Sequence, residues 1–122
     1  MSNFGFKNLV IWQRSIKWSA TIYKLTENFP DAEKFGLINQ IRRCSASVSS
    51  NIAEGYGRFS NKEFIHFLRI ARGSLYESVS QLVLCSILGF IPQEKEQELE
   101  SEAEEIDKMF TTFINNLEKK IK

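Results

Sequence analysis

Apolar residues recur every three or four positions along almost the whole chain, which is the spacing that lines one face of an α-helix. Short breaks divide the pattern into four segments, at about residues 8–28, 36–56, 61–88 and 92–119. No segment shows the two-residue alternation that is typical of a half-buried strand. Four helices with short connections predict a single all-α domain, an antiparallel up-down four-helix bundle.

Three of the segments each show one clear apolar stripe. The stripe of the second segment contains many small residues, which predicts close packing against a neighbouring helix, and its members are Leu37, Ile41, Ser45, Val48 and Ile52. The stripe of the third consists of Phe64, Leu68, Ala71, Leu75, Val79 and Leu82. The fourth is close to a heptad seam and consists of Leu99, Ala103, Ile106, Phe110, Phe113, Leu117 and Ile121. Gly89 and Pro92 fit the turn between the third and fourth segments.

The first segment carries two apolar lines. The one assigned to the bundle core is formed by Leu9, Trp12, Ile16, Ser19, Tyr23 and Thr26. The second repeats every seven residues and is formed by Ile11, Trp18 and Leu25. Together they are wider than the ~100° arc that a core-facing helix requires. The second line, with Phe67 and Ile70 of the third segment, therefore predicts an oligomer interface.

The charges are unevenly distributed along the 122-residue chain, although its net charge is only +1. Residues 1–72 hold eleven Lys and Arg against five Asp and Glu, whereas residues 73–122 hold five against ten. This asymmetry is consistent with a polyanionic partner. It is equally consistent with a basic half that pairs with an acidic half inside the fold or between subunits.

The central stretch "SNIAEGYGRFSNKEF", Ser50 to Phe64, is the best candidate for a chemical site. A phosphate-binding loop would need a preceding strand and a longer glycine-rich run. Here a helix precedes it, the glycines are expected to end that helix, and "SNKE" is a capping box that starts the next. We interpret the stretch as a structural corner, with Glu54 and Arg58 close enough to pair.

Catalytic and metal-binding patterns are weak elsewhere. His66 is the only histidine, and Cys44 and Cys85 lie far apart without the spacing of metal ligands. Both cysteines fall on apolar faces and are interpreted as free core thiols in a reducing cytoplasm. No apolar run reaches the ~20 residues of a membrane span, and no signal-peptide pattern is visible. We expect a cytoplasmic protein without enzymatic activity or cofactor.

The segment from "FGLINQIRRCSASVSSNIAEGYGR" to "FSNKEFIHFLRIARGSLYE", together with "NLVIWQRS" and "IYKLTENFP", resembles a known family. Its members are four-helix-bundle proteins encoded in intervening sequences of bacterial 23S ribosomal RNA genes. The resemblance covers about Phe6 to Gly89 and implies a ring-like homo-oligomer, a pentamer, without established enzymatic activity. The accessory variability determinant of diversity-generating retroelements is similar to this family, which implies nucleic acid and a reverse transcriptase as partners.

The basic residues organise on helix faces in a way that can track a phosphate backbone. The candidate nucleic-acid-binding residues are Arg14, Lys17, Lys24, Arg42, Arg43, Arg58, Lys62, His66, Arg69 and Arg72. Two functions stay open at this point. One is a homo-oligomeric bundle that binds RNA or DNA by charge and shape; the other is an oligomeric scaffold whose charges serve contacts between subunits or with a protein partner.

Overall fold

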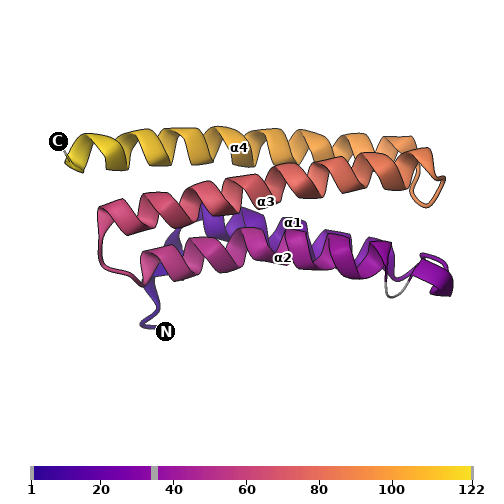
Figure 1. Cartoon of the computed structure of the whole chain (residues 1–122), viewed down its shortest axis with the longest axis horizontal. Coiled ribbons are helices and arrows are strands. Elements are labelled where there is room, and N and C mark those ends of the chain that lie inside the picture. The colour runs from indigo at the N-terminus through magenta and orange to yellow at the C-terminus, as the bar shows by residue number, and fades with distance from the viewer. Residues whose placement is uncertain (1, 34–35, 122) are drawn as a thin grey trace.

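The computed structural model describes residues 2–33 and 36–121. Within these ranges the chain forms four α-helices, and no strand is present: α1 (Val10–Thr26), α2 (Leu37–Tyr56), α3 (Asn61–Ile87) and α4 (Gln93–Ile121). Two short 3-10 turns, η1 (Gly5–Asn8) and η2 (Asp31–Glu33), precede α1 and α2. The helices run alternately up and down one long axis (Figure 1). The all-α four-helix architecture expected from the sequence is confirmed, and each helix begins and ends within two residues of its expected range.

The core lies along the bundle axis, and α2 contributes to it as expected. All five residues of its predicted stripe are buried, and α2 packs most extensively on α3. Small residues allow this closeness: Ser74 donates a hydrogen bond to Ser47 across the two helices, with 3.0 Å between the hydroxyl oxygens. None of the four helices has a stretch apolar and long enough to cross a membrane over the part of the chain described here.

The α3–α4 turn follows from its sequence. Gly89 has a φ of +82°, in the left-handed region that favours glycine. The amide of Phe90 donates to the carbonyl of Cys85 at 2.9 Å, and the amide of Gly89 donates to the carbonyl of Ser86 at 3.0 Å. These two bonds form a Schellman motif, which satisfies carbonyl groups that the end of α3 would leave unpaired.

The corner between α2 and α3 differs from the expectation in one respect. Ser60 caps α3, since its hydroxyl accepts from the amide of Glu63 at 3.3 Å. The glycines, however, do not break α2 by unusual backbone angles: Gly55 lies inside the helix, and Gly57 has a φ of −72°. The left-handed residue is Phe59, with a φ of +57°. The chain therefore reverses at an aromatic residue rather than at a glycine.

The apolar lines of α1 also differ from the expectation, because the second line is turned toward the core and two residues of the first are exposed. Ile11 and Trp18 are 3% and 2% exposed, so assigning them to an oligomer interface was wrong. Leu25 of the same line packs against the core as well. Ile16 and Tyr23, which were assigned to the core, are 40% and 41% exposed. Both lines belong to one wide apolar arc, and packing against α2 and α4 decides which of its residues turn inward.

The two interface residues predicted on α3 lie at its surface. Ile70 is 42% exposed. Phe67 is half-buried, because its ring lies under the Arg58 guanidinium at 4.9 Å and its Cβ sits close to Gly55. Of the five predicted interface residues, Ile70 is thus the most available for a contact with another molecule.

Candidate nucleic-acid interface

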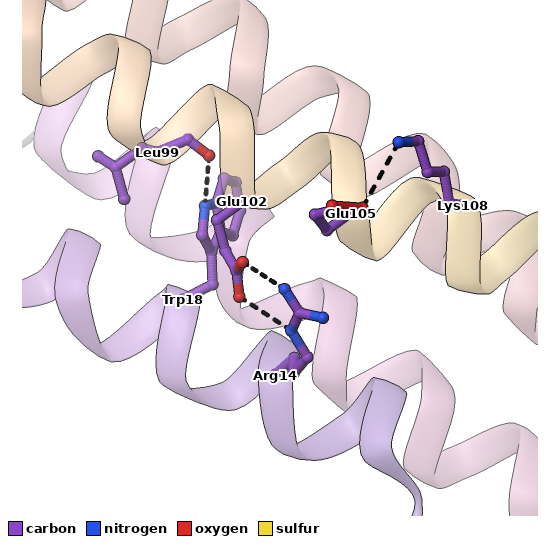
Figure 2. Close-up of polar contacts among 6 residues, drawn as sticks. All are labelled: Arg14, Trp18, Leu99, Glu102, Glu105 and Lys108. Atoms are coloured by element: carbon purple, nitrogen blue, oxygen red, sulfur yellow. Dashed lines mark hydrogen bonds and ion pairs between the residues drawn. The ribbon is translucent and has the colours of Figure 1, made fainter.

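The seam between α1 and α4 engages the first candidate cation, Arg14. Its Nε donates to Oε2 of Glu102 at 3.1 Å, and a second bond joins Nη2 to the other carboxylate oxygen. One turn further along α1, the indole N–H of Trp18 donates to the carbonyl of Leu99 at 2.9 Å (Figure 2). Trp18 can therefore be buried without an unsatisfied donor. Both side chains join the two helices, and Arg14 is not free to bind an external phosphate.

The seam between α3 and α4 engages two more candidates. Arg69 pairs with Glu118 at 2.9 Å, and Nε of Arg72 lies 2.6 Å from Oδ1 of Asp107. The hydroxyl of Tyr76 donates to the same aspartate at 2.7 Å. Burial favours the neutral form of Asp107, but the hydrogen bonds from Arg72 and Tyr76 outweigh it and lower the pKa of this carboxyl group.

Arg42 and Arg58 are also held by the chain itself. Nε of Arg42 donates to the hydroxyl of Thr26 at 2.8 Å, and its guanidinium lies over the ring of Tyr23. Arg58 pairs with Glu54 at 2.7 Å, the pairing that the sequence spacing predicts. The bond from Arg42 joins α1 to α2, whereas the pair of Arg58 spans one turn at the corner. Half of the ten candidate residues therefore have partners in the bundle.

The other five candidates are exposed and have no ion pair in the described ranges: Lys17, Lys24, Arg43, Lys62 and His66. They do not form one belt. Lys17 and Lys24 flank the groove between α1 and α4, whereas Arg43 lies beside the groove between α2 and α3. Lys62 and His66 begin the exposed face of α3. The stripes inferred from the sequence thus belong to three different faces.

The fold instead collects charge at the two ends of the bundle. One end of the bundle is where α1 and α3 begin and α2 and α4 finish. When each helix is divided at its middle, this end comprises residues 2–18, 47–74 and 107–121, and it is basic. These residues hold ten Lys and Arg against four Asp and Glu, a net charge of +6. The remaining described residues, at the acidic end, hold four against eleven, a net charge of −7. We call these the basic end and the acidic end; they lie left and right in Figure 1.

Phe59 is the most unusual residue of the basic end. Its side chain is 96% exposed, and its backbone is in the left-handed region. A left-handed conformation costs a non-glycine residue roughly 1–2 kcal/mol. An apolar residue directly before a helix cap often packs on the fourth residue of that helix, here Phe64. Phe64 instead contacts Tyr56 and Phe113 edge-on, at centroid distances of 6.0 and 5.3 Å. Phe59 therefore makes no visible contribution to the core.

Sequence reasoning missed Phe59 because it concentrated on the glycines and charges around it. A signal was present: an aromatic residue stands between Arg58 and Ser60 in a polar corner, three residues before Lys62. Lys119 and Lys120, in the last turn of α4, were missed as well. Their place at the basic end follows only from the antiparallel arrangement of α3 and α4.

The remaining reactive groups lie apart from one another. Cys44 and Cys85 are both buried free thiols. Burial raises the pKa of both, that of Cys85 to about 11, so neither is a ready nucleophile. Three or more metal-ligating side chains do not gather anywhere in the described ranges. Glu96 is buried in α4 with one carboxylate oxygen lacking a partner, and burial together with Glu100 raises its pKa.

Comparisons with known proteins agree with this architecture. A crystal structure of a protein of unknown function from the S23 ribosomal protein family of Bacteroides thetaiotaomicron is similar, with a TM-score of 0.76 and 27% sequence identity. The match covers 86% of this chain and 98% of that one. No curated protein matches the chain. The model of the 23S rRNA-intervening sequence protein family matches residues 7–112, most of the sequence. The chain therefore belongs to the 23S rRNA-intervening sequence protein family.

Proposed function

We propose that this protein is a non-enzymatic, homo-oligomeric bundle that binds single-stranded RNA or DNA at its basic end. The observation that carries the proposal is the pairing of an exposed, strained aromatic residue, Phe59, with a net charge of +6 on the same end. Phe59 is not part of the core, and this end keeps six more cations than carboxylates. Proteins that bind single strands without reading their sequence usually combine exposed aromatic rings with a positively charged surface.

The chemistry of binding follows from these groups. Lys62, Lys119 and Lys120 are exposed and can neutralise phosphates, which releases condensed counterions. The ring of Phe59 offers a face on which a base can stack, worth about 1–3 kcal/mol per base. Because every base has such a face and no base-reading motif is present in the sequence, we expect little sequence preference.

Self-association is supported by the exposed apolar residues of α1 and α3. Val10, Ile16 and Tyr23 on α1 are 56%, 40% and 41% exposed, and Ile70 on α3 is 42% exposed. The resemblance described above implies a pentamer. An oligomer would bring several basic ends onto one strand, and linked weak sites raise the overall affinity without new contacts.

The direct test is a salt titration of labelled single-stranded RNA and DNA, followed by fluorescence anisotropy. Each neutralised phosphate contributes about −0.7 to the log–log slope on single strands. The double variant Lys62→Glu/Lys120→Glu should weaken binding to every sequence. The matched control, Lys24→Glu/Arg43→Glu, makes the same charge change at the acidic end and should have the smaller effect.

Phe59→Gly separates binding from stability. It should raise the melting temperature, because glycine relieves the left-handed strain, and it should weaken binding about tenfold or more because the stacking surface is lost. If Phe59 instead stabilised the fold, Phe59→Gly would lower the melting temperature and the affinity together. Unchanged affinity would contradict the stacking role.

The scaffold is a second candidate, favoured by the arginines that pair within the bundle. It makes a distinct prediction: self-association persists, but neither RNA nor DNA binds even at low salt. Sedimentation at tens of micromolar tests the oligomer that both candidates require. Ile16→Ser/Tyr23→Ser should weaken it, and a clean monomer of the unmodified protein would contradict both candidates.

A further inference from the structure

A groove that the nucleic-acid proposal does not use begins at the middle of the bundle and lies mostly on the side of the acidic end. It lies between α3 and α4 and encloses about 240 Å³. Its lining combines apolar side chains of α3 with carboxylates of α4: Leu75, Tyr76, Val79, Glu100, Ala103, Glu104 and Asp107. We call it the acidic groove.

The apolar wall of the acidic groove continues toward the α3–α4 turn. Tyr76, Val79, Val83 and Ile87 follow one another at spacings of three, four and four residues, so they lie along one side of α3. Val83 is 37% exposed and Ile87 is 77% exposed. Leu84 and Leu88 are exposed on the adjoining line of the helix. Contiguous aliphatic exposure of this kind on a soluble bundle commonly marks a binding surface.

The opposite wall is anionic. Glu100 and Glu104 lie one turn apart on α4, and neither makes an ion pair with any residue that the structure describes. Glu96 lies one further turn back and is buried, with Oε2 lacking a hydrogen-bond partner. Burial, and after it the neighbouring Glu100, raises the pKa of Glu96. Asp107 is already neutralised by Arg72 and is not part of this unpaired set.

We propose that the acidic groove binds an amphipathic basic helix of a partner protein. Aliphatic side chains of that helix would cover Tyr76, Val83 and Ile87, while its Lys or Arg side chains would meet Glu100 and Glu104. The choice of partner rests on charge complementarity: an apolar line flanked by unpaired carboxylates accepts a helix that is apolar on one side and cationic on the next. This surface extends from the middle of the bundle toward the acidic end, does not include Phe59 or the lysines of the proposed nucleic-acid interface, and does not depend on it.

The length of the groove fixes the size of the helix. Tyr76 to Ile87 covers twelve residues of α3. The eleven steps between them span about 17 Å at the rise of an α-helix, which three turns of a partner helix would cover. An isolated helix so short is marginal in water, so a probe needs roughly 18 residues. A suitable probe is a labelled peptide of leucine and lysine, with leucine at three- and four-residue spacing.

Fluorescence anisotropy of this peptide against the full-length protein tests the proposal. Removing two facing charges should weaken binding about tenfold, so we expect that loss for Glu100→Gln/Glu104→Gln. Val83→Ser/Ile87→Ser should weaken it by a similar factor because the apolar wall is lost. The matched control, Glu27→Gln/Glu94→Gln, makes the same change in net charge at the acidic end but outside the groove.

Several results would overturn the proposal. One is an equal loss for the control variant, since net charge would then explain the affinity. Another is equal binding of a peptide in which glutamate replaces every lysine. A third is that Val83→Ser/Ile87→Ser converts an oligomer to a monomer in sedimentation, because a second copy of this chain would then occupy the groove.

Discussion

The same substitution at two helical glycines should have opposite effects on the stability of this bundle. Gly73 lies in the middle of α3, and a Cβ atom built there has no neighbouring atom within 4 Å. Gly55 lies in α2 where it faces α3, and a Cβ atom there would be 2.7 Å from Cβ of Phe67 and 2.9 Å from a ring carbon of Phe64. Neither glycine has a positive φ.

The magnitudes follow from these contacts. Alanine is about 1 kcal/mol better than glycine in a helix interior, so Gly73→Ala should stabilise the protein by about that amount. Gly55 is the second-last residue of α2, where the gain is smaller. Ordinary contact begins at 3.4 Å, so α2 and α3 must separate by several tenths of an ångström to admit the new atom. Overpacking of this kind costs about 1–3 kcal/mol, which exceeds the gain.

Thermal unfolding followed by circular dichroism measures both effects. For a domain of 122 residues, 1 kcal/mol corresponds to roughly 3–5 °C in melting temperature. Gly73→Ala should therefore melt at a higher temperature and Gly55→Ala at a lower one. Each variant is the control for the other, because the chemical change is identical. A stable Gly55→Ala variant would refute the close approach of α2 and α3, and an unstable Gly73→Ala variant would show that something covers Gly73.

Three further outcomes are expected. Ser60→Ala should cost about 1 kcal/mol in urea denaturation, because the first turn of α3 loses its cap, whereas an unchanged midpoint would contradict the capping role. Cys85, whose pKa is raised to about 11 by burial, should react with Ellman's reagent at pH 8 only as fast as the bundle opens, so rapid labelling of the native protein would contradict its burial. The pKa of Asp107 is held below its usual 3.8 by Arg72 and Tyr76, so the unfolded chain binds more protons near that pH and stability should fall as the pH drops below about 4. Asp107→Asn should be less stable than the unmodified protein at pH 7, and the difference between them should shrink in acid.

The sequence was sufficient for the architecture and for the packing face of α2. Its stripe from Leu37 to Ile52 is narrow, with polar residues on both sides, so only one orientation buries it. The cap at Ser60 and the left-handed turn at Gly89 were equally predictable, because each depends on interactions within a few residues. The pairing of Glu54 with Arg58 was predictable for the same reason, since the two residues lie one helical turn apart.

Features that depend on neighbouring helices could not be read from the sequence in this way. The apolar arc of α1 is wide enough to accept two orientations. Packing against α2 and α4, including the bond from Trp18 to the carbonyl of Leu99, decides that Trp18 rather than Ile16 faces inward. The arginine partners Glu102 and Asp107 lie 88 and 35 residues away from Arg14 and Arg72. Helical spacing places a side chain on a face, but it does not determine which helix lies opposite.

The distribution of charge shows most clearly the difference between what the local sequence fixes and what helix packing fixes. Counting along the sequence separates a basic half from an acidic half, but these halves are not surfaces. Folding the chain back on itself three times brings the start of α3 to the same end as the finish of α4, and so places Lys62 at the same end of the bundle as Lys119 and Lys120. It also leaves Phe59 exposed at that end. The sequence determined how much charge the molecule carries and on which helix faces; the antiparallel packing alone decided that this charge gathers at two opposite ends.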